Sequence, residues 1–166
     1  MKDVKITTVI KECSFEELTD ADRELVEAAK AMTRTSYVPY SRFHVGAAIR
    51  LADGSIVRGS NQENAAYPSG MCAERTACYQ AGALHPGVPF EKIAVAAWSD
   101  TGKAPGLRRE EYFQKEPISP CGACRQALLE YEKLAEKPVE VILYGRDKIF
   151  IFPSVASLLP FSFTEF

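Results

Sequence analysis

The sequence predicts an α/β fold of three layers: a mixed five-stranded sheet, helices on both of its faces, and an antiparallel last pair of strands. Helix-like and strand-like segments alternate over residues 19–166, a length that suits a single domain. Residues 92–99 are almost continuously apolar, as is typical of a strand buried on both faces. Only residues 145–147 join the last two strands, whereas a parallel crossover needs about a dozen residues or more.

The chain begins with a predicted N-terminal extension over residues 1–18, in which a short strand is expected at 4–10. Thr19 or Asp20 can cap the first helix of the domain. Apolar residues then recur at helical spacing, so this helix is expected to run to about Arg34.

The middle of the chain predicts a β-hairpin followed by a helix. Residues 43–51 and 55–60 are rich in strand-forming residues, and the turn-forming segment 52–54 lies between them. The helix is expected to run from Cys72 to about Ala81 and to end at Gly82.

The last third of the chain continues the alternation of strands and helices. The expected elements after the buried strand are a helix over 121–136, the two antiparallel strands 139–144 and 148–152, and a short helix over 154–159.

Composition favours a soluble protein that acts on a small molecule. The chain is 46% apolar and 25% charged, and its net charge of −2 comes from acids and bases mixed along the sequence. No basic face of the kind that binds nucleic acid is expected. The apolar run 93–98 is far too short to span a bilayer, and no signal peptide is recognised at residues 1–5. These features predict a cytoplasmic protein with no membrane partner, whose cysteines stay reduced.

A split set of cysteines carries the chemistry. Cys72 is followed two residues later by Glu74, and Cys121 and Cys124 form a Cys-x-x-Cys pair. Three thiolates fill three of the four tetrahedral positions of Zn²⁺ and leave the fourth for water. Both thiol groups lie where helices are predicted to begin, and helix N-termini stabilise thiolates. Glu74 is therefore expected to move protons, with Arg75 compensating the excess negative charge of the thiolates.

These residues are open to two other interpretations. In the first, the cysteines hold a purely structural zinc ion and Glu74 is an ordinary first-turn glutamate. A closed site usually has a fourth Cys or His, which the spacing does not offer. In the second, Cys121 and Cys124 form a redox pair, which leaves Cys72 and Glu74 without a purpose. Cys13 and Cys78 are expected to be plain thiols.

With these residues in view, the chain resembles the small, homotetrameric, zinc-dependent class of cytidine deaminases. The resemblance extends over most of residues 20–163 and implies a cytidine deaminase-like fold. It is carried by four blocks: Pro39 to Ala48 (PYSRFHVGAA), Asn61 to Pro68 (NQENAAYP), Cys72 to Arg75 (CAER) and Pro120 to Gln126 (PCGACRQ).

The resemblance implies roles for named residues. One zinc ion per subunit would be held by the three cysteines, with Glu74 as the proton shuttle. Asn61 and Glu63 would hold the ribose, Phe43 would pack against the base, and the backbone N–H of Ala73 would read the pyrimidine carbonyl. The sites of the family are completed across subunits, at positions that match Ala65, Tyr67 and Phe163.

The implied activity is the hydrolytic deamination of cytidine and 2′-deoxycytidine to uridine and 2′-deoxyuridine, a reaction of pyrimidine salvage. Three alternatives stay open at this point. In the first, the protein carries out the same chemistry on another aminopyrimidine nucleoside such as blasticidin S. In the second, it is a non-catalytic, zinc-stabilised binding protein. The third is a deaminase of DNA or RNA, which the mildly acidic charge and the short link over residues 145–147 oppose. Polynucleotide deaminases resemble one another in having a helix between those strands.

Two segments depart from the pattern of the family. Residues 99–119 form a longer connection into the cysteine pair than is usual, and loops of this length are often functional. This connection is a candidate cover for the active site or a determinant of substrate choice. The N-terminal extension is also unusual, and the sequence assigns it no role.

Overall fold

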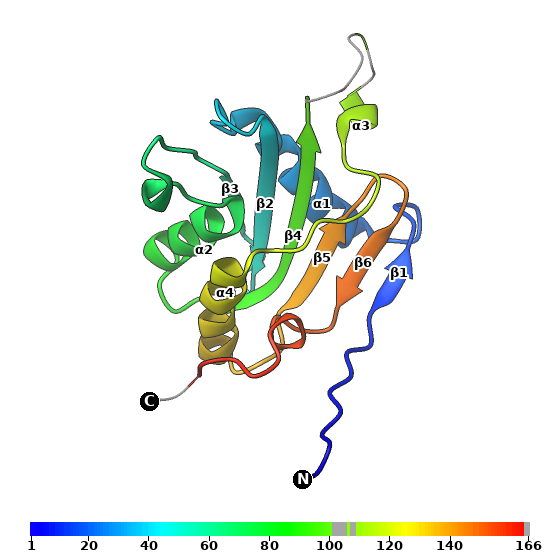
Figure 1. Cartoon of the computed structure of the whole chain (residues 1–166), viewed down its shortest axis with the longest axis vertical. Coiled ribbons are helices and arrows are strands. Elements are labelled where there is room, and N and C mark those ends of the chain that lie inside the picture. Colours follow the sequence, from blue (N-terminus) through cyan, green and yellow to red (C-terminus); the bar gives the residue numbers. More distant parts are fainter. Residues whose placement is uncertain (101–105, 107–108, 165–166) are drawn as a thin grey trace.

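The fold is one mixed sheet between helices, in a computed structural model that describes residues 1–100, 106 and 109–164. The six strands follow the order β1-β6-β5-β4-β2-β3 across the sheet (Figure 1). The strands are β1 (Lys11–Cys13), β2 (Phe43–Leu51), β3 (Ile56–Ser60), β4 (Phe90–Ser99), β5 (Glu140–Tyr144) and β6 (Ile149–Phe152). The helices are α1 (Asp20–Met32), α2 (Ala73–Leu84), α3 (Arg109–Tyr112) and α4 (Gly122–Ala135), with 3-10 turns η1 (Thr33–Thr35), η2 (Tyr67–Ser69) and η3 (Ala156–Leu158).

The predicted three-layer α/β architecture is confirmed. Helix α1 packs on one face of the sheet, and α2 and α4 pack on the other, so two apolar clusters lie on opposite sides of the strands. Strands β4 and β5 are parallel, whereas β5 and β6 are antiparallel, as the short link between them requires. The predicted cap of α1 is also present, because the backbone N–H of Asp22 donates to Thr19 Oγ1 at 3.1 Å.

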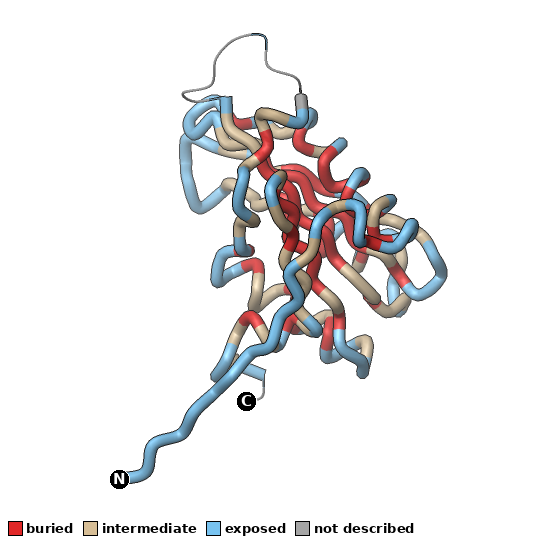
Figure 2. Tube along the Cα trace, turned by 90° about the vertical axis from the view of Figure 1, so that its right-hand side faces the viewer, coloured by how far each residue is buried: buried red, intermediate tan, exposed pale blue. Residues whose placement is uncertain are grey.

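The sheet has six strands, so the prediction of five is wrong. The added strand is β1, which pairs antiparallel with β6 and places Lys11 opposite Ile151. The strand expected at residues 4–10 is not formed there, since continuing this register would set residue 9 against Pro153, which has no N–H to donate. Residues 1–10 are instead exposed (Figure 2), and Thr8 Oγ1 in this segment donates a hydrogen bond to the carbonyl oxygen of Ser157 at 3.1 Å.

Gly82 lies inside α2, so the prediction that it ends the helix is wrong. A Cβ atom at this position would stand 2.2 Å from the hydroxyl oxygen of Tyr131 in α4. The glycine therefore makes room for the Tyr131 ring between the two helices. The helix continues to Leu84, where the backbone N–H of His85 closes it on Ala81.

Lys30 joins the two segments that depart from the family pattern. Its side chain is 5% exposed, and its Nζ atom forms ion pairs with Glu27 at 2.6 Å and Glu110 at 2.9 Å. Three rings surround Nζ at 5.0–5.4 Å from their centroids: Phe15, Phe113 and Tyr144. Burial opposes the charge, but the two carboxylates outweigh it and raise the pKa of Lys30. Phe15 belongs to the N-terminal extension, and Glu110 and Phe113 belong to the 99–119 connection.

The long connection is thus packed over residues 110–113 on the α1 side of the sheet, whereas Ile118 packs on the α2 side. Tyr112 lies edge-on to Trp98, with ring centroids 5.6 Å apart. Trp98 in turn stacks on His44, with centroids 3.9 Å apart. The expectation that the connection covers the active site falls partly on residues 101–105 and 107–108, which lie outside the described residues.

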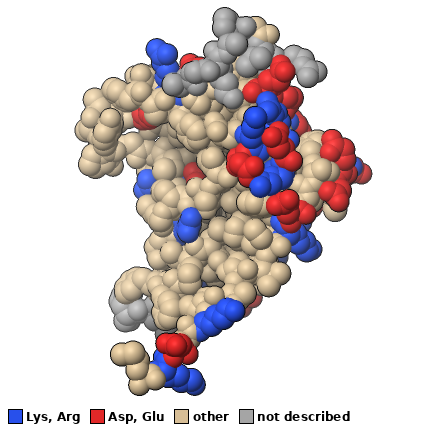
Figure 3. All heavy atoms as spheres, turned by 45° about the vertical axis from the view of Figure 1, so that its right-hand side comes forward, with Lys and Arg blue, Asp and Glu red and all other residues tan. Residues whose placement is uncertain are grey.

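Charges are mixed on the surface, and no described helix has the length and apolar character that a membrane span requires. On the face drawn in Figure 3, basic and acidic side chains gather together. Lys92, for example, pairs with Asp22 at 2.8 Å and with Glu140 at 2.9 Å.

Gly59→Ala is expected to destabilise the protein strongly, because Gly59 brings β3 against the backbone of α2. An added Cβ atom would lie 2.4 Å from the amide nitrogen of Ala77 and 2.6 Å from the carbonyl oxygen of Ala73. Such overpacking costs about 2–3 kcal/mol of unfolding free energy, to be measured by urea denaturation. Gly122→Ala is the control: apart from its chain neighbours and the backbone of its own helix, no described heavy atom lies within 4 Å of its added Cβ, and a change within about 0.5 kcal/mol is expected. Equal stability of the two variants would contradict the close contact.

Candidate metal centre and active site

The fold brings three cysteine thiols together at the starts of two helices. Cys72 is the N-cap of α2, Cys121 is the N-cap of α4, and Cys124 lies in the first turn of α4. The sulfur of Cys121 is 3.8 Å from that of Cys72 and 3.4 Å from that of Cys124. In the described part of the chain, these residues form the one group of at least three Cys, His, Asp or Glu side chains with ligand atoms within 4.8 Å of one another.

The donor set fits a zinc ion. With Zn–S bonds of about 2.3 Å, a tetrahedral ion holds its sulfur ligands about 3.8 Å apart. The sulfur separations of 3.4 and 3.8 Å are close to that value. Three sulfur donors leave one tetrahedral position for a water molecule or substrate.

The surroundings of Cys72 favour ionisation of its thiol. Hydrogen bonding from the Cys124 thiol, aided by Arg75, lowers the pKa of Cys72 to about 5. Nη2 of Arg75 lies 4.0 Å from the Cys72 sulfur. The same hydrogen bond, together with burial, raises the pKa of Cys124. The arrangement therefore already stabilises negative charge on sulfur, which metal binding requires.

Glu74 is a buried carboxyl group beside these sulfurs. It lies in the first turn of α2 and is 4% exposed. Burial, reinforced by the negative charge of Cys72, raises the pKa of Glu74 to about 7. Cys72 precedes the helix with extended backbone angles (φ −73°, ψ 153°). Its side chain is thus not bound by the helical rule that sets residues two apart on opposite sides.

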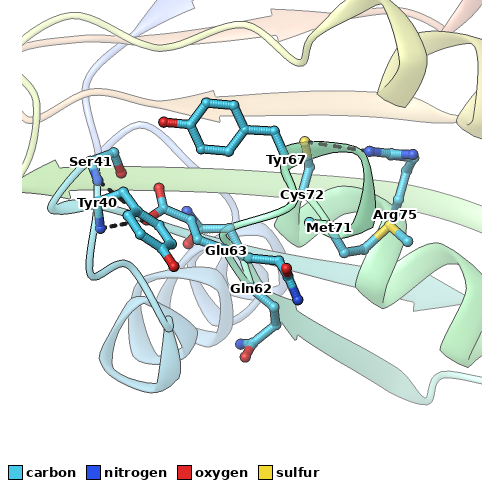
Figure 4. Close-up of a pocket in the computed structure, with 11 residues that line it drawn as sticks. Tyr40, Ser41, Gln62, Glu63, Tyr67, Met71, Cys72 and Arg75 are labelled. Atoms are coloured by element: carbon cyan, nitrogen blue, oxygen red, sulfur yellow. Dashed lines mark hydrogen bonds between the residues drawn. The ribbon is translucent and has the colours of Figure 1, made fainter.

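A pocket of about 440 Å³ opens beside Cys72 and Arg75 (Figure 4). Glu63 lies in its wall, where Oε2 accepts hydrogen bonds from the backbone N–H groups of Tyr40 at 3.0 Å and Ser41 at 3.2 Å. Burial opposes the ionisation of Glu63, but hydrogen bonds from these two residues outweigh it and lower the pKa of the carboxyl group. A carboxylate is therefore presented to the pocket.

Asn61 also lines the pocket and is held by the start of β2. Its Oδ1 accepts from the backbone N–H of Val45 at 2.8 Å, and its Nδ2 donates to the carbonyl oxygen of Phe43 at 2.9 Å. Phe43 is partly buried and packs against the apolar cluster on the α2 side of the sheet. The two residues are thus brought side by side, with Asn61 fixed in orientation.

Of the other predicted site residues, some line the pocket and some do not. Ala73 is fully buried as the first residue of α2. Tyr67 is 77% exposed and lines the pocket. Ala65 and Phe163 are exposed, and within the described residues of this single chain they do not contribute to the pocket wall.

Several pocket residues were not predicted from the sequence. Tyr40 and Ser41 hold the predicted Glu63 through their backbone N–H groups, which leave no mark on residue type. Gln62 and Met71 exchange two backbone hydrogen bonds of 2.8 Å, which hold the segment before Cys72 against the pocket wall. The unpredicted lining residues are Tyr40, Ser41, Gln62, Asn64, Gly70 and Met71.

Comparison with known proteins agrees with this geometry. Residues 19–137 match the family model of the cytidine and deoxycytidylate deaminase zinc-binding region. A cytidine deaminase of Halalkalibacterium halodurans is 38% identical over 144 residues, which cover 86% of this chain and 95% of that protein. A cytidine deaminase of Sporosarcina psychrophila is 38% identical over 147 residues, 88% of this chain and 93% of the relative.

A solved structure of a cytidine deaminase is also similar to this chain. The crystal structure of cytidine deaminase from Burkholderia pseudomallei superposes with a TM-score of 0.69 at 38% identity, covering 88% of this chain and all of the other. The chain therefore belongs to the family of zinc-binding cytidine and deoxycytidylate deaminases.

Proposed function

We propose that this protein catalyses the hydrolytic deamination of cytidine and 2′-deoxycytidine to uridine and 2′-deoxyuridine. The observation that carries the proposal is a buried glutamate beside three clustered cysteine thiols, one of which, Cys72, lines a pocket of about 440 Å³. The relatives named as cytidine deaminases support the choice of substrate.

The zinc ion would be held by Cys72, Cys121 and Cys124, one ion per subunit. When bound, it supplies a Lewis acid that makes water nucleophilic near neutral pH. Three thiolates leave a net charge of −1 on a dication. Arg75 and the N-termini of α2 and α4 offset that charge, which keeps the site electrophilic.

Glu74 would carry the protons of the reaction. Its carboxylate takes a proton from the attacking water and delivers it to N3 of the pyrimidine. A second proton then passes from the added oxygen through Glu74 to the amino group, which leaves as ammonia. A carboxyl pKa near 7 suits both directions of transfer at neutral pH.

The pocket residues would orient the nucleoside. Asn61 and Glu63 offer an amide and a carboxylate to the ribose hydroxyl groups, which both donate and accept hydrogen bonds. Phe43 would pack against the base, and the Ala73 N–H at the start of α2 would bind the pyrimidine carbonyl.

We further propose a homotetramer in which Ala65, Tyr67 and Phe163 complete a neighbouring site. Their exposure in the single chain leaves them available for such contacts. The enzyme would act in the cytoplasm in pyrimidine salvage, on a small-molecule nucleoside, with neither nucleic acid nor membrane as partner.

An ultraviolet assay beside a metal count tests this function. Cytidine and 2′-deoxycytidine are expected to lose their cytosine absorbance band in the presence of the protein, with one zinc ion per chain and ammonia released in equal amount to uridine. Blasticidin S is the comparison substrate. Faster turnover of blasticidin S than of both nucleosides would overturn the substrate assignment. Zinc binding without turnover of any of the three would favour a structural role for the metal.

A further inference from the structure

Of the three cysteines, Cys121 is the one whose position is least fixed by burial or by hydrogen bonds of its own. Cys124 is fully buried inside α4, and the segment before Cys72 is fixed by the paired backbone of Gln62 and Met71. Cys121 is exposed, and its side chain makes no capping hydrogen bond to the helix that it begins. Something else must therefore set the position of its sulfur.

Arg125 holds the backbone on both sides of Cys121. Its Nε donates to the carbonyl oxygen of Pro120 at 2.8 Å, and its Nη2 donates to Ser119 Oγ at 2.8 Å. The backbone N–H of Arg125 donates to the carbonyl oxygen of Cys121 at 3.0 Å. One residue thus fixes the peptide units before and after this thiol.

The remaining arm of the guanidinium reaches the C-terminal segment. Nη1 of Arg125 donates to the carbonyl oxygen of Leu158 at 2.8 Å, at the end of η3. The start of η3 is held by Glu132, two helical turns further along α4, whose carboxylate accepts from the N–H groups of Val155 at 2.7 Å and Ala156 at 3.0 Å. Glu132 anchors the start of η3, and the backbone N–H of Leu158 donates to the carbonyl oxygen of Val155 at 2.9 Å, so Leu158 presents a fixed acceptor to Arg125.

We propose that Arg125 is a positioning residue for the metal: its guanidinium ties the Ser119–Cys121 segment to η3 and so aims the Cys121 sulfur at the other two. The inference rests on the proposed zinc site. The planar fork matters more than the charge, because three acceptors in different directions are met by three N–H groups of fixed geometry. A lysine keeps the charge but cannot reproduce that fork.

The test is the release of zinc from the loaded protein to a chromogenic chelator. Arg125→Lys is expected to lower zinc affinity by about 10- to 100-fold, the range seen when groups that orient a metal ligand are removed. The activity per bound zinc ion should stay close to that of the wild type, since Arg125 is not among the residues that line the pocket. Arg23→Lys is the matched control: Arg23 donates to the carbonyl oxygens of Glu16 at 3.1 Å and Leu18 at 2.6 Å, but at the start of α1 on the opposite face of the sheet.

If Arg125→Lys binds zinc as tightly as the wild type, the inference is overturned but the proposed function is not. The same holds if Arg23→Lys loses as much zinc as Arg125→Lys. If Arg125→Lys does not fold, Ser119→Ala removes one acceptor of the same fork. Faster zinc release from that variant supports the inference, and unchanged release overturns it. A wild-type protein that binds no zinc overturns the proposed function as well.

Discussion

Glu74→Gln is expected to remove nearly all deamination of cytidine while the protein keeps its zinc and its fold. Glutamine has the shape of glutamate, but its amide cannot accept and return protons near neutral pH. The loss of such a proton-transfer group lowers kcat by about 10²–10⁴-fold. Zinc should remain, because the three sulfur donors are unchanged.

Thermal unfolding separates this effect from damage to the structure. Glu74 is buried at 4% exposure, and burying its charge costs free energy in the wild type. The neutral amide avoids that cost, so the midpoint temperature of the variant should equal or exceed that of the wild type. Deamination by Glu74→Gln at the wild-type rate would show that the roles in the site are wrongly assigned.

Cys124→Ala is expected to lose both the bound zinc and the activity. Cys124 is fully buried, with its sulfur 3.4 Å from that of Cys121, so no solvent-exposed group can take its place on the ion. Two sulfur donors do not retain zinc against a chelator as three do, because each ligand contributes a large part of the binding free energy. The measurements are metal content after dialysis against a chelator and the ultraviolet assay on the same sample.

Cys78→Ala provides the control for packing. Cys78 is also a fully buried thiol, in α2, but its sulfur lies 4.0 Å from the carbonyl oxygen of Ala127 and not in the cysteine cluster. Burial alone raises the pKa of Cys78 to about 12, as expected for an inert thiol. This variant should keep zinc and activity. Retention of one zinc ion by Cys124→Ala would contradict the proposed ligand set.

Local sequence patterns predicted most of the elements. The apolar spacing of α1, the alternation in the β2–β3 hairpin and the short link between β5 and β6 depend on neighbours in the chain, and the structure agrees with each. The errors arose where distant residues decide. Gly82 is required by a ring on another helix, and β1 is placed by its pairing with β6.

The same distinction applies to the candidate site. Cys72 and Glu74 stand in one short motif and Cys121 and Cys124 in another, and a zinc ion that needs all three thiols predicts that the two motifs meet. The contacts of Glu63 with Tyr40 and Ser41, and of Arg125 with Leu158, use backbone atoms. Every residue type carries those atoms, so only the folded chain reveals which of them meet.

The rings and carboxylates around Lys30 make the N-terminal extension and the 99–119 connection depend on each other. Deleting the start of the chain through Phe15 would remove one ring from the ammonium group, and shortening the connection through Phe113 would remove another ring and the Glu110 carboxylate. Either deletion alone would leave the buried Lys30 ammonium group without part of the rings and carboxylates that stabilise its charge. A shortened enzyme would tolerate both cuts better with a neutral side chain at position 30, so protein engineers should treat the three places as a single module.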